Sequence, residues 1–168
     1  QYTMAQTKLG ENTVNTTGEL PAIGSNLPAF TLTGADMKDV TAAQFAGKKL
    51  ILNIFPSIDT GICSASVREF NKRAAATPGA AVLCVSRDLP FALKRFCGAE
   101  GITNVTTATD FRDHGFGKSF GVELIDGNFR GLLARCVIVA DESGKVIHSQ
   151  IVPAIGQEPD YDAAYAAL

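Results

Sequence analysis

The sequence predicts one α/β domain in which a mixed β-sheet has helices on both faces and follows an N-terminal β-hairpin. Short apolar runs of the kind that form buried strands recur at 50–55, 80–86 and 135–140, and segments with helical periodicity follow the first two. The chain has 168 residues and 46% hydrophobic content, which is enough to bury the core of one domain. We therefore expect a single compact unit.

The first forty-odd residues are expected to form peripheral β structure. They are rich in Thr, Asn and Gly, with a turn at 9–12 between two short strands and a further extended piece at 31–33. Residues 1–3 (Gln-Tyr-Thr) precede Met4, and we interpret them as an expression scar before the natural start. The domain itself would then span 4–168.

The stretch 49–70 has the clearest local pattern. Its apolar run ends at Pro56, which cannot donate to a strand ladder. After a short loop, Cys63, Val67 and Phe70 recur at the spacing of one helix face, while charged residues occupy the other face. The sequence therefore predicts a buried strand, a proline loop and then a helix.

Cys63 would lie in the first turn of that helix. Unpaired backbone N–H groups and the positive end of the helix dipole favour a thiolate there, and Asp59 or Thr60 is available as the helix cap. The thiolate is the nucleophilic form of cysteine, so these surroundings suit chemistry. The structural alternative is a small buried hydrophobic residue.

The remaining elements follow in order. The run 80–86 predicts a second buried strand, and Asp88 is a candidate cap for a helix that has Pro90 in its first turn and carries Cys97. Next come a short strand at 105–108, a helical piece at 112–120, a strong strand at 135–140, its hairpin partner at 145–152 and an Ala-rich helix at 163–168. This order is typical of thioredoxin-like architecture.

Charge and hydropathy exclude two classes of partner. The formal net charge of −2 and the pI near 5.7 give no basic surplus for binding nucleic acid. No apolar stretch approaches the ~20 residues that a membrane span needs, and the first thirty residues lack the apolar core of a secretory signal. We expect a cytoplasmic protein with no membrane partner.

The cysteines do not have the spacing of a metal site. No two of the four are close enough in sequence to form the paired ligands of zinc sites, and only His114 and His148 could assist them. We therefore expect no metal and no other cofactor. Cys84 and Cys136 each lie in an apolar strand and are predicted to serve packing.

Pro56, Thr60 and Cys63 match the Pro-x-x-x-Thr-x-x-Cys signature, and here the sequence resembles the peroxiredoxins. It is most similar to the bacterial atypical two-cysteine thiol peroxidases. The similar segments are 53–60, 89–92, 95–101, 126–127, 131–135 and 158–161. They span nearly the whole natural chain.

The resemblance implies a role for each of five residues. Cys63 would be the peroxidatic cysteine, Cys97 the resolving cysteine of the same chain, and Arg135 the residue that supports the thiolate. Thr60 would hydrogen-bond the sulfur and the peroxide, and Pro56 would shield the pocket. The resemblance also implies a thioredoxin fold, a homodimer, no metal or haem, and recycling by thioredoxin or a similar dithiol.

On this hypothesis the chain is a thiol-dependent peroxidase for hydrogen peroxide and for organic hydroperoxides, alkyl and lipid ones included. Cys63 would become a sulfenic acid and condense with Cys97 to an intramolecular disulfide. A peroxide-sensing redox switch or interaction protein remains an alternative. So does a thioredoxin-like disulfide exchanger, although residue 60 is threonine where such an enzyme needs a cysteine.

Four of the site residues have structural alternatives. Cys97 could be a core cysteine of an amphipathic helix, and Arg135 could be a solvated strand end. Thr60 could be the helix cap and Pro56 the end of the strand, with no further role.

Overall fold

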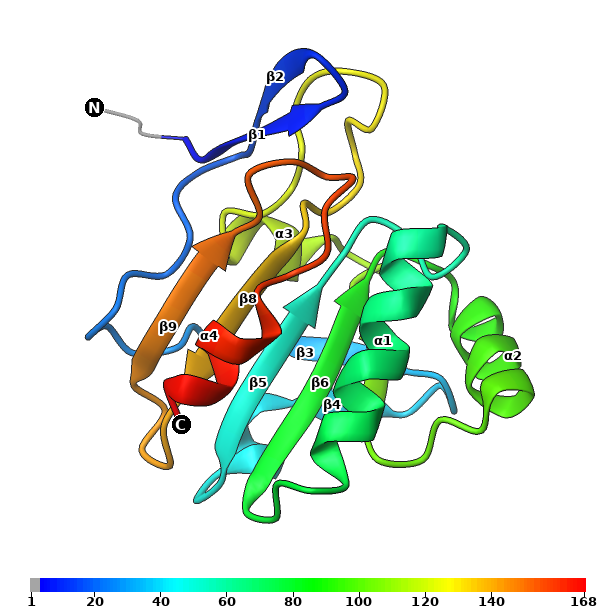
Figure 1. The fold of residues 1–168 in the computed structure, drawn as a ribbon, viewed down its shortest axis with the longest axis vertical. Helices are drawn as coiled ribbons and strands as arrows, with labels where there is room; N and C mark the ends of the chain where they lie inside the picture. Colours follow the sequence, from blue (N-terminus) through cyan, green and yellow to red (C-terminus); the bar gives the residue numbers. More distant parts are fainter. Residues whose placement is uncertain (1–3) are drawn as a thin grey trace.

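The computed structural model describes residues 4–168 and confirms the α/β class with a mixed central sheet (Figure 1). The seven-stranded sheet has the order β4-β3-β7-β6-β5-β8-β9, and a separate β1-β2 hairpin lies at one end of the molecule. Residues 1–3, which we interpret as an expression scar, lie outside the described residues.

The strands are β1 (Gln6–Leu9), β2 (Asn12–Asn15), β3 (Thr31–Gly34), β4 (Asp39–Thr41), β5 (Lys49–Ile54), β6 (Ala80–Ser86), β7 (Thr106–Thr109), β8 (Cys136–Ala140) and β9 (Val146–Ile151). The helices are α1 (Gly61–Ala74), α2 (Pro90–Glu100), α3 (Gly115–Ser119) and α4 (Tyr161–Ala166), with a short 3-10 helix η1 (Ala42–Phe45). The N-terminal hairpin and the three strong strands are as predicted, whereas β4 and η1 were not predicted from the sequence.

The central strands are apolar along their length because both faces of the sheet are covered. β5 pairs with β6 in parallel and with β8 antiparallel, so Ile54 lies opposite both Val85 and Cys136. Helices α1, α2 and α4 pack on one face around Phe55, Val67 and other buried residues. The sheet therefore forms the middle layer of a three-layer structure.

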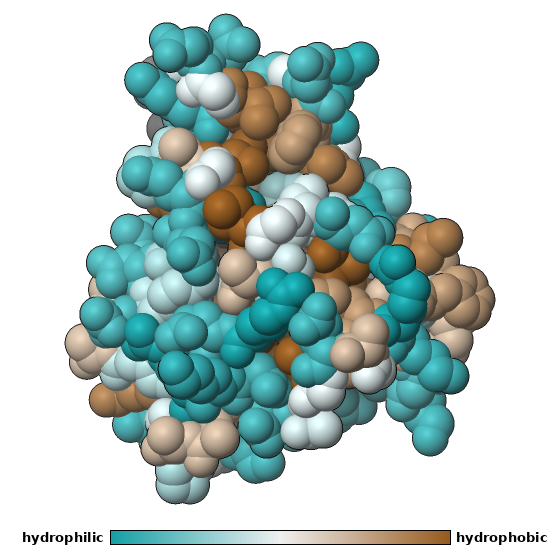
Figure 2. Space-filling view, turned by 45° about the vertical axis from the view of Figure 1, so that its right-hand side comes forward, coloured by the Kyte–Doolittle hydropathy of each residue, from teal (hydrophilic) through white to brown (hydrophobic). Residues whose placement is uncertain are grey.

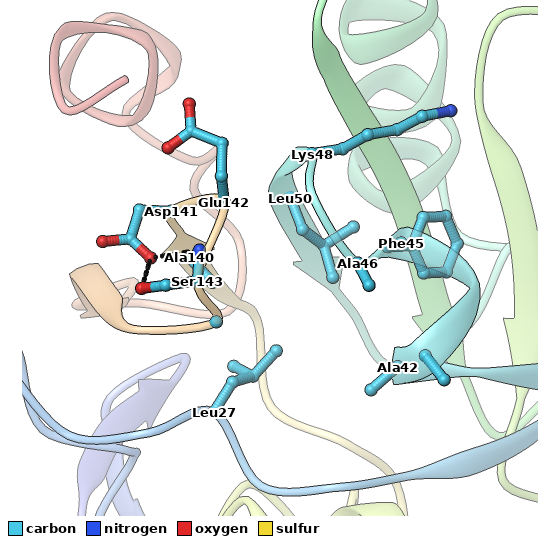
Figure 3. A pocket seen from close by; sticks show the side chains of 12 residues that line it. Leu27, Ala42, Phe45, Ala46, Lys48, Leu50, Ala140, Asp141, Glu142 and Ser143 are labelled. Carbon is cyan, nitrogen blue, oxygen red and sulfur yellow. Dashed lines mark hydrogen bonds between the residues drawn. The ribbon is translucent and has the colours of Figure 1, made fainter.

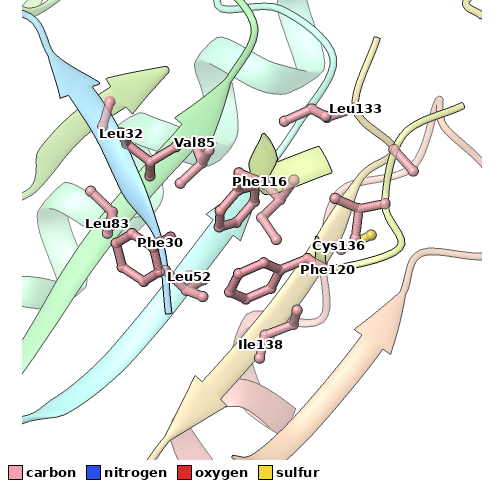
Figure 4. Packing of buried hydrophobic residues seen from close by; sticks show 14 of the residues in the cluster. Phe30, Leu32, Leu52, Leu83, Val85, Phe116, Phe120, Leu133, Cys136 and Ile138 are labelled. Atoms are coloured by element: carbon pink, nitrogen blue, oxygen red, sulfur yellow. The ribbon is translucent and has the colours of Figure 1, made fainter. Parts of the chain in front are cut away.

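The second face is covered by α3 and by segments from the N-terminal part of the chain. Its centre is aromatic: Phe116 and Phe120 stack at a centroid distance of 4.0 Å, and Phe30 meets both rings edge-on (Figure 4). Cys136 points into this cluster from β8, as expected of a packing cysteine.

Three helix starts differ from the predicted ones. α3 begins at Gly115, after the left-handed residue His114, and is shorter than the predicted 112–120. α4 begins at Tyr161, because the side chain of Asp160 accepts a hydrogen bond from the Ala163 N–H and caps the helix there. α2 has Pro90 in its first turn as predicted, but its N-cap is a leucine, so the prediction of Asp88 as the cap is wrong.

Hydrophilic side chains cover most of the face drawn in Figure 2, and hydrophobic ones gather in a band in its upper half. Over residues 4–168, no helix is both long enough and apolar enough to cross a bilayer.

Candidate active site

The site forms where β5 ends and α1 begins. Pro56 is buried two residues beyond the end of β5, and Thr60 occupies the N-cap position of α1 with extended backbone angles. Cys63 is the third residue of the helix, so its predicted place in the first turn is confirmed. Its side chain is fully buried among Ile58, Val67 and other apolar residues.

Arg135 approaches Cys63 from the neighbouring strand. It directly precedes β8, and because Cys136 pairs with Ile54, Arg135 comes level with the segment that leaves β5. Its Nη2 donates to Cys63 Sγ at 3.4 Å, and its Nε donates to the carbonyl of Ile155 at 2.9 Å. A positive charge that donates to the sulfur favours the thiolate over the thiol.

The arginine is only 2% exposed, so the alternative of a solvated strand end is wrong. Its Nη1 is buried and has no hydrogen-bond partner among the described residues. Leaving a buried charged donor unpaired is costly. Nη1 of the same guanidinium therefore has a donor available for an acceptor oxygen.

Thr60 uses its only hydroxyl proton within the loop. Thr60 Oγ1 donates to the carbonyl of Ser57 at 3.0 Å and makes no capping bond to α1. Since the proton is engaged there, the free lone pairs of this hydroxyl can act only as acceptors. Thr60 therefore stands at the helix cap position, as the structural alternative expected, but its side chain does not cap the helix.

Cys97 lies on α2 and is partly exposed. Its Sγ is 3.5 Å from Thr107 Oγ1 on β7, and the residue borders an open cavity of about 470 Å³ together with Lys94 and Ile102. None of the four cysteines forms a disulfide in this structure. Cys97 is thus reachable from solvent, but in this state its sulfur packs toward β7.

The other two cysteines are suited to packing. Cys84 and Cys136 are both fully buried, and burial raises the pKa of the Cys84 thiol to about 12 and also raises the pKa of the Cys136 thiol. Both therefore stay protonated at neutral pH and are poor nucleophiles. The structure agrees with the predicted packing role of both residues.

Sequence reasoning missed the partners of the loop that precedes Cys63. The carboxylate of Asp88 accepts hydrogen bonds from Ser57 Oγ and from the Ile58 N–H. In the sequence, the only hint is an acidic residue that falls one position too early to cap α2.

A cavity of about 260 Å³ lies at the other end of β5 and β8 (Figure 3). Leu27, Phe45, Leu50 and Ala140 line its apolar part, with Glu142 at its edge. No cysteine contributes to it, so this cavity is separate from the thiol site. Within residues 4–168, no group of three His, Cys, Asp or Glu side chains is placed to hold a metal ion.

A thioredoxin-like sheet that presents a buried arginine to a cysteine in the first turn of a helix is the arrangement of a thiol-based oxidoreductase. The family-level comparisons agree. The chain belongs to the Redoxin family, whose model matches residues 22–165. Its relatives in that family include thiol peroxidases.

The chain is 58% identical over 165 residues to a thiol peroxidase of Mycobacterium tuberculosis, covering 98% of this chain and 99% of that protein. It is 53% identical to a thiol peroxidase of Corynebacterium glutamicum over the same shares of both chains. A peroxiredoxin-like protein from Aquifex aeolicus has a TM-score of 0.91 at 36% identity, with 98% of this chain and 96% of that chain covered.

Proposed function

We propose that this chain is a thiol-dependent peroxidase that reduces hydrogen peroxide and organic hydroperoxides, alkyl and lipid ones included, at Cys63. The observation that carries the proposal is the contact of Arg135 Nη2 with Cys63 Sγ, beside the unpaired donor Nη1. One guanidinium can hold the thiolate and still have a donor for a peroxide oxygen. A cysteine that served only packing would need neither a positive charge at its sulfur nor a free donor nearby.

In the first step, the Cys63 thiolate attacks the terminal oxygen of the hydroperoxide and the O–O bond breaks. Cys63 becomes a sulfenic acid, and the other oxygen leaves as water or an alcohol after it takes up a proton. Arg135 Nη1 stabilises the charge that develops on the oxygens. Thr60, as an acceptor, orients the peroxide O–H, and buried Pro56 keeps water away from the sulfur.

In the second step, the Cys97 thiol condenses with the sulfenic acid, water leaves, and a Cys63–Cys97 disulfide forms. A disulfide requires Cα atoms within about 7 Å. Cys97 Sγ packs toward Thr107, and Cys63, in the first turn of α1, is fully buried. The end of one or both helices therefore has to unfold locally before the sulfurs meet.

A dithiol reductant such as thioredoxin then reduces the Cys63–Cys97 disulfide by exchange, and its own two thiols are oxidised to a disulfide. The open cavity beside Cys97 gives such a partner access to the Cys97 side of the disulfide.

We also propose a cytoplasmic homodimer. Leu89 and Phe91, at the start of α2, are 55% and 68% exposed and offer an apolar surface for association.

Mass spectrometry after one equivalent of peroxide tests the assignment. A Cys63–Cys97 linkage should dominate, and a Cys84–Cys136 linkage would contradict the assignment.

Cys63→Ser should abolish peroxide consumption. Cys97→Ser should permit the first oxidation but stop turnover with thioredoxin, while Cys136→Ala, as the matched control, should turn over normally.

The alternative of a peroxide-sensing switch shares the first oxidation, so turnover discriminates the two. A sensor need not cycle with thioredoxin, whereas a peroxidase must consume many equivalents of peroxide per chain. The disulfide exchanger is not supported, because Thr60 stands where its first cysteine would have to be.

A further inference from the structure

The loop that leads to Cys63 and the start of α2 meet at one edge of the sheet. β5 and β6 are parallel neighbours, so the segments that follow them leave from the same edge. We call residues 56–60 the peroxidatic loop. Asp88, two residues beyond the end of β6, faces this loop.

The carboxylate of Asp88 does not serve the helix it precedes. Oδ1 accepts from Ser57 Oγ at 2.8 Å, and Oδ2 accepts from the Ile58 N–H at 2.7 Å and from Ser86 Oγ at 2.6 Å. None of the described hydrogen bonds to this carboxylate comes from α2, whose N-cap has no side-chain cap bond. Two of the three bonds therefore hold the peroxidatic loop.

Ser57 passes this restraint on to Thr60. The Ser57 carbonyl accepts from both the backbone N–H of Thr60, at 3.2 Å, and its hydroxyl, at 3.0 Å. Ser57 Oγ also accepts from the Asp59 N–H at 3.2 Å, which closes the turn. The direction in which the Thr60 hydroxyl offers its lone pairs thus depends on where Asp88 holds Ser57.

A carboxylate suits this position. Three donors converge on its two oxygens, and an acceptor-only group can receive all of them. An amide of the same size would direct N–H groups at one or two of these donors. Hydrogen bonds to an ionised acceptor are also roughly twice as strong as neutral ones.

We propose that Asp88 is a positioning residue of the peroxidase site, which orients Thr60 toward the hydroperoxide through Ser57. The proposal rests on the proposed peroxidase function and adds a residue that does not touch the sulfur or the substrate. Its effect is confined to reactions that use Thr60 as an acceptor.

Two reactions of the same thiolate separate this role from a general loosening of the loop. Asp88→Asn should lower the single-turnover rate constant for oxidation of Cys63 by hydrogen peroxide roughly 10- to 100-fold, as expected when a reactant is misoriented. The rate of alkylation of Cys63 by iodoacetamide at the same pH should not fall. Alkylation does not use Thr60 as an acceptor, so a misoriented Thr60 hydroxyl leaves its rate unchanged.

An unchanged peroxide rate in Asp88→Asn would overturn the proposal. So would a parallel fall of both rates, because that would indicate a loop that is merely disordered. If Asp88→Asn does not fold, the same two rates are measured in Ser57→Ala, which removes only the hydroxyl that binds Asp88. Thr60→Val combined with Asp88→Asn should react with peroxide no more slowly than Thr60→Val alone, since Asp88→Asn acts only by misorienting the acceptor that Thr60→Val has already removed.

Asp113→Asn is the matched control. Asp113 Oδ1 also accepts a backbone N–H at the start of a helix, from Gly115 at 2.9 Å, but on the face of the sheet covered by α3. Both rates should remain at the wild-type level in this variant. A wild-type chain that does not react with peroxide would overturn the proposed function, whereas equal rates in an active wild type and Asp88→Asn overturn only the role of Asp88.

Discussion

Arg135 shows how one residue can be costly for folding and useful for chemistry. Its guanidinium is almost fully buried, with no carboxylate among its described hydrogen-bond partners, and its contacts are the Cys63 sulfur and the Ile155 carbonyl. A buried charge without an opposite charge is unfavourable. In the proposed function, the reacting thiolate form of Cys63 supplies that opposite charge.

Arg135→Lys should lower the rate of Cys63 oxidation by hydrogen peroxide by roughly 100-fold or more. Lysine keeps the charge but cannot bind Ile155, the sulfur and a peroxide oxygen with one rigid planar group. Stopped-flow measurement of single-turnover oxidation checks this. Arg130→Lys, at an exposed arginine that donates to the Gly127 carbonyl, should react like the wild type.

Cys84→Ala should reduce the free energy of unfolding by about 1–2 kcal/mol because it leaves a small void in the core. It also removes the sulfur that accepts a hydrogen bond from Asn53 Nδ2 at 3.7 Å. Turnover with thioredoxin should stay unchanged, since this buried thiol takes no part in the proposed cycle. Urea denaturation and steady-state kinetics measure the two effects, and a loss of turnover in a folded Cys84→Ala protein would contradict the packing role.

At the scale of elements, the chain that follows the N-terminal hairpin packs directly against the end of α3. Gly121 follows this helix with φ +68°, and a Cβ there would clash with the carbonyl of Glu19. Both the positive φ and the close approach of two backbones require glycine. This contact joins the peripheral hairpin region to the core.

Gly121→Ala should therefore cost about 2 kcal/mol more in free energy of unfolding than Gly10→Ala. Gly10 has a similar φ of +62° in the β1-β2 turn, but a Cβ there meets nothing within 4 Å. The two substitutions thus introduce similar backbone strain, and only Gly121→Ala adds a clash with the Glu19 carbonyl. Equal losses of stability in urea would show that Glu19 can move away without cost.

At the scale of the whole molecule, stability depends on pH through groups whose protonation differs between the folded and unfolded chains. Burial lowers the pKa of His148 on β9, and the negative charge of Asp160 only partly opposes this. The Nε2 atom of His148 is buried and has no described partner. The folded state therefore favours the neutral ring.

Because the folded pKa of His148 lies below its unfolded value of about 6.5, the unfolded chain binds more protons as the pH falls through that value. The free energy of unfolding should thus decrease between pH 7.5 and pH 5.5. In His148→Gln this decrease should be smaller, as measured by urea denaturation at both pH values. An equally large decrease in His148→Gln would contradict this role of His148.

Much of the fold could be read from the sequence because its strands and helices carry strong local patterns. The buried strands β5, β6 and β8 were predicted nearly to the residue, since a sheet covered on both faces demands nearly continuous apolar runs. The short elements β4, η1 and α3 were missed or misplaced. Their conformation depends on what they pack against, which periodicity in so few residues cannot encode.

The sequence by itself determined that a cysteine stands in the first turn of a helix behind a proline loop, because strand end, turn and helix start all follow from neighbouring residues. The resemblance implied Arg135 as a partner of that cysteine, but only the tertiary structure showed how distant groups reach it. Arg135, 72 residues away, reaches the sulfur because β8 pairs with β5 in one register. Asp88 binds the peroxidatic loop rather than α2, because the parallel strands β5 and β6 end at the same edge of the sheet. Local sequence specifies neither the Arg135 contact nor the Asp88 contact.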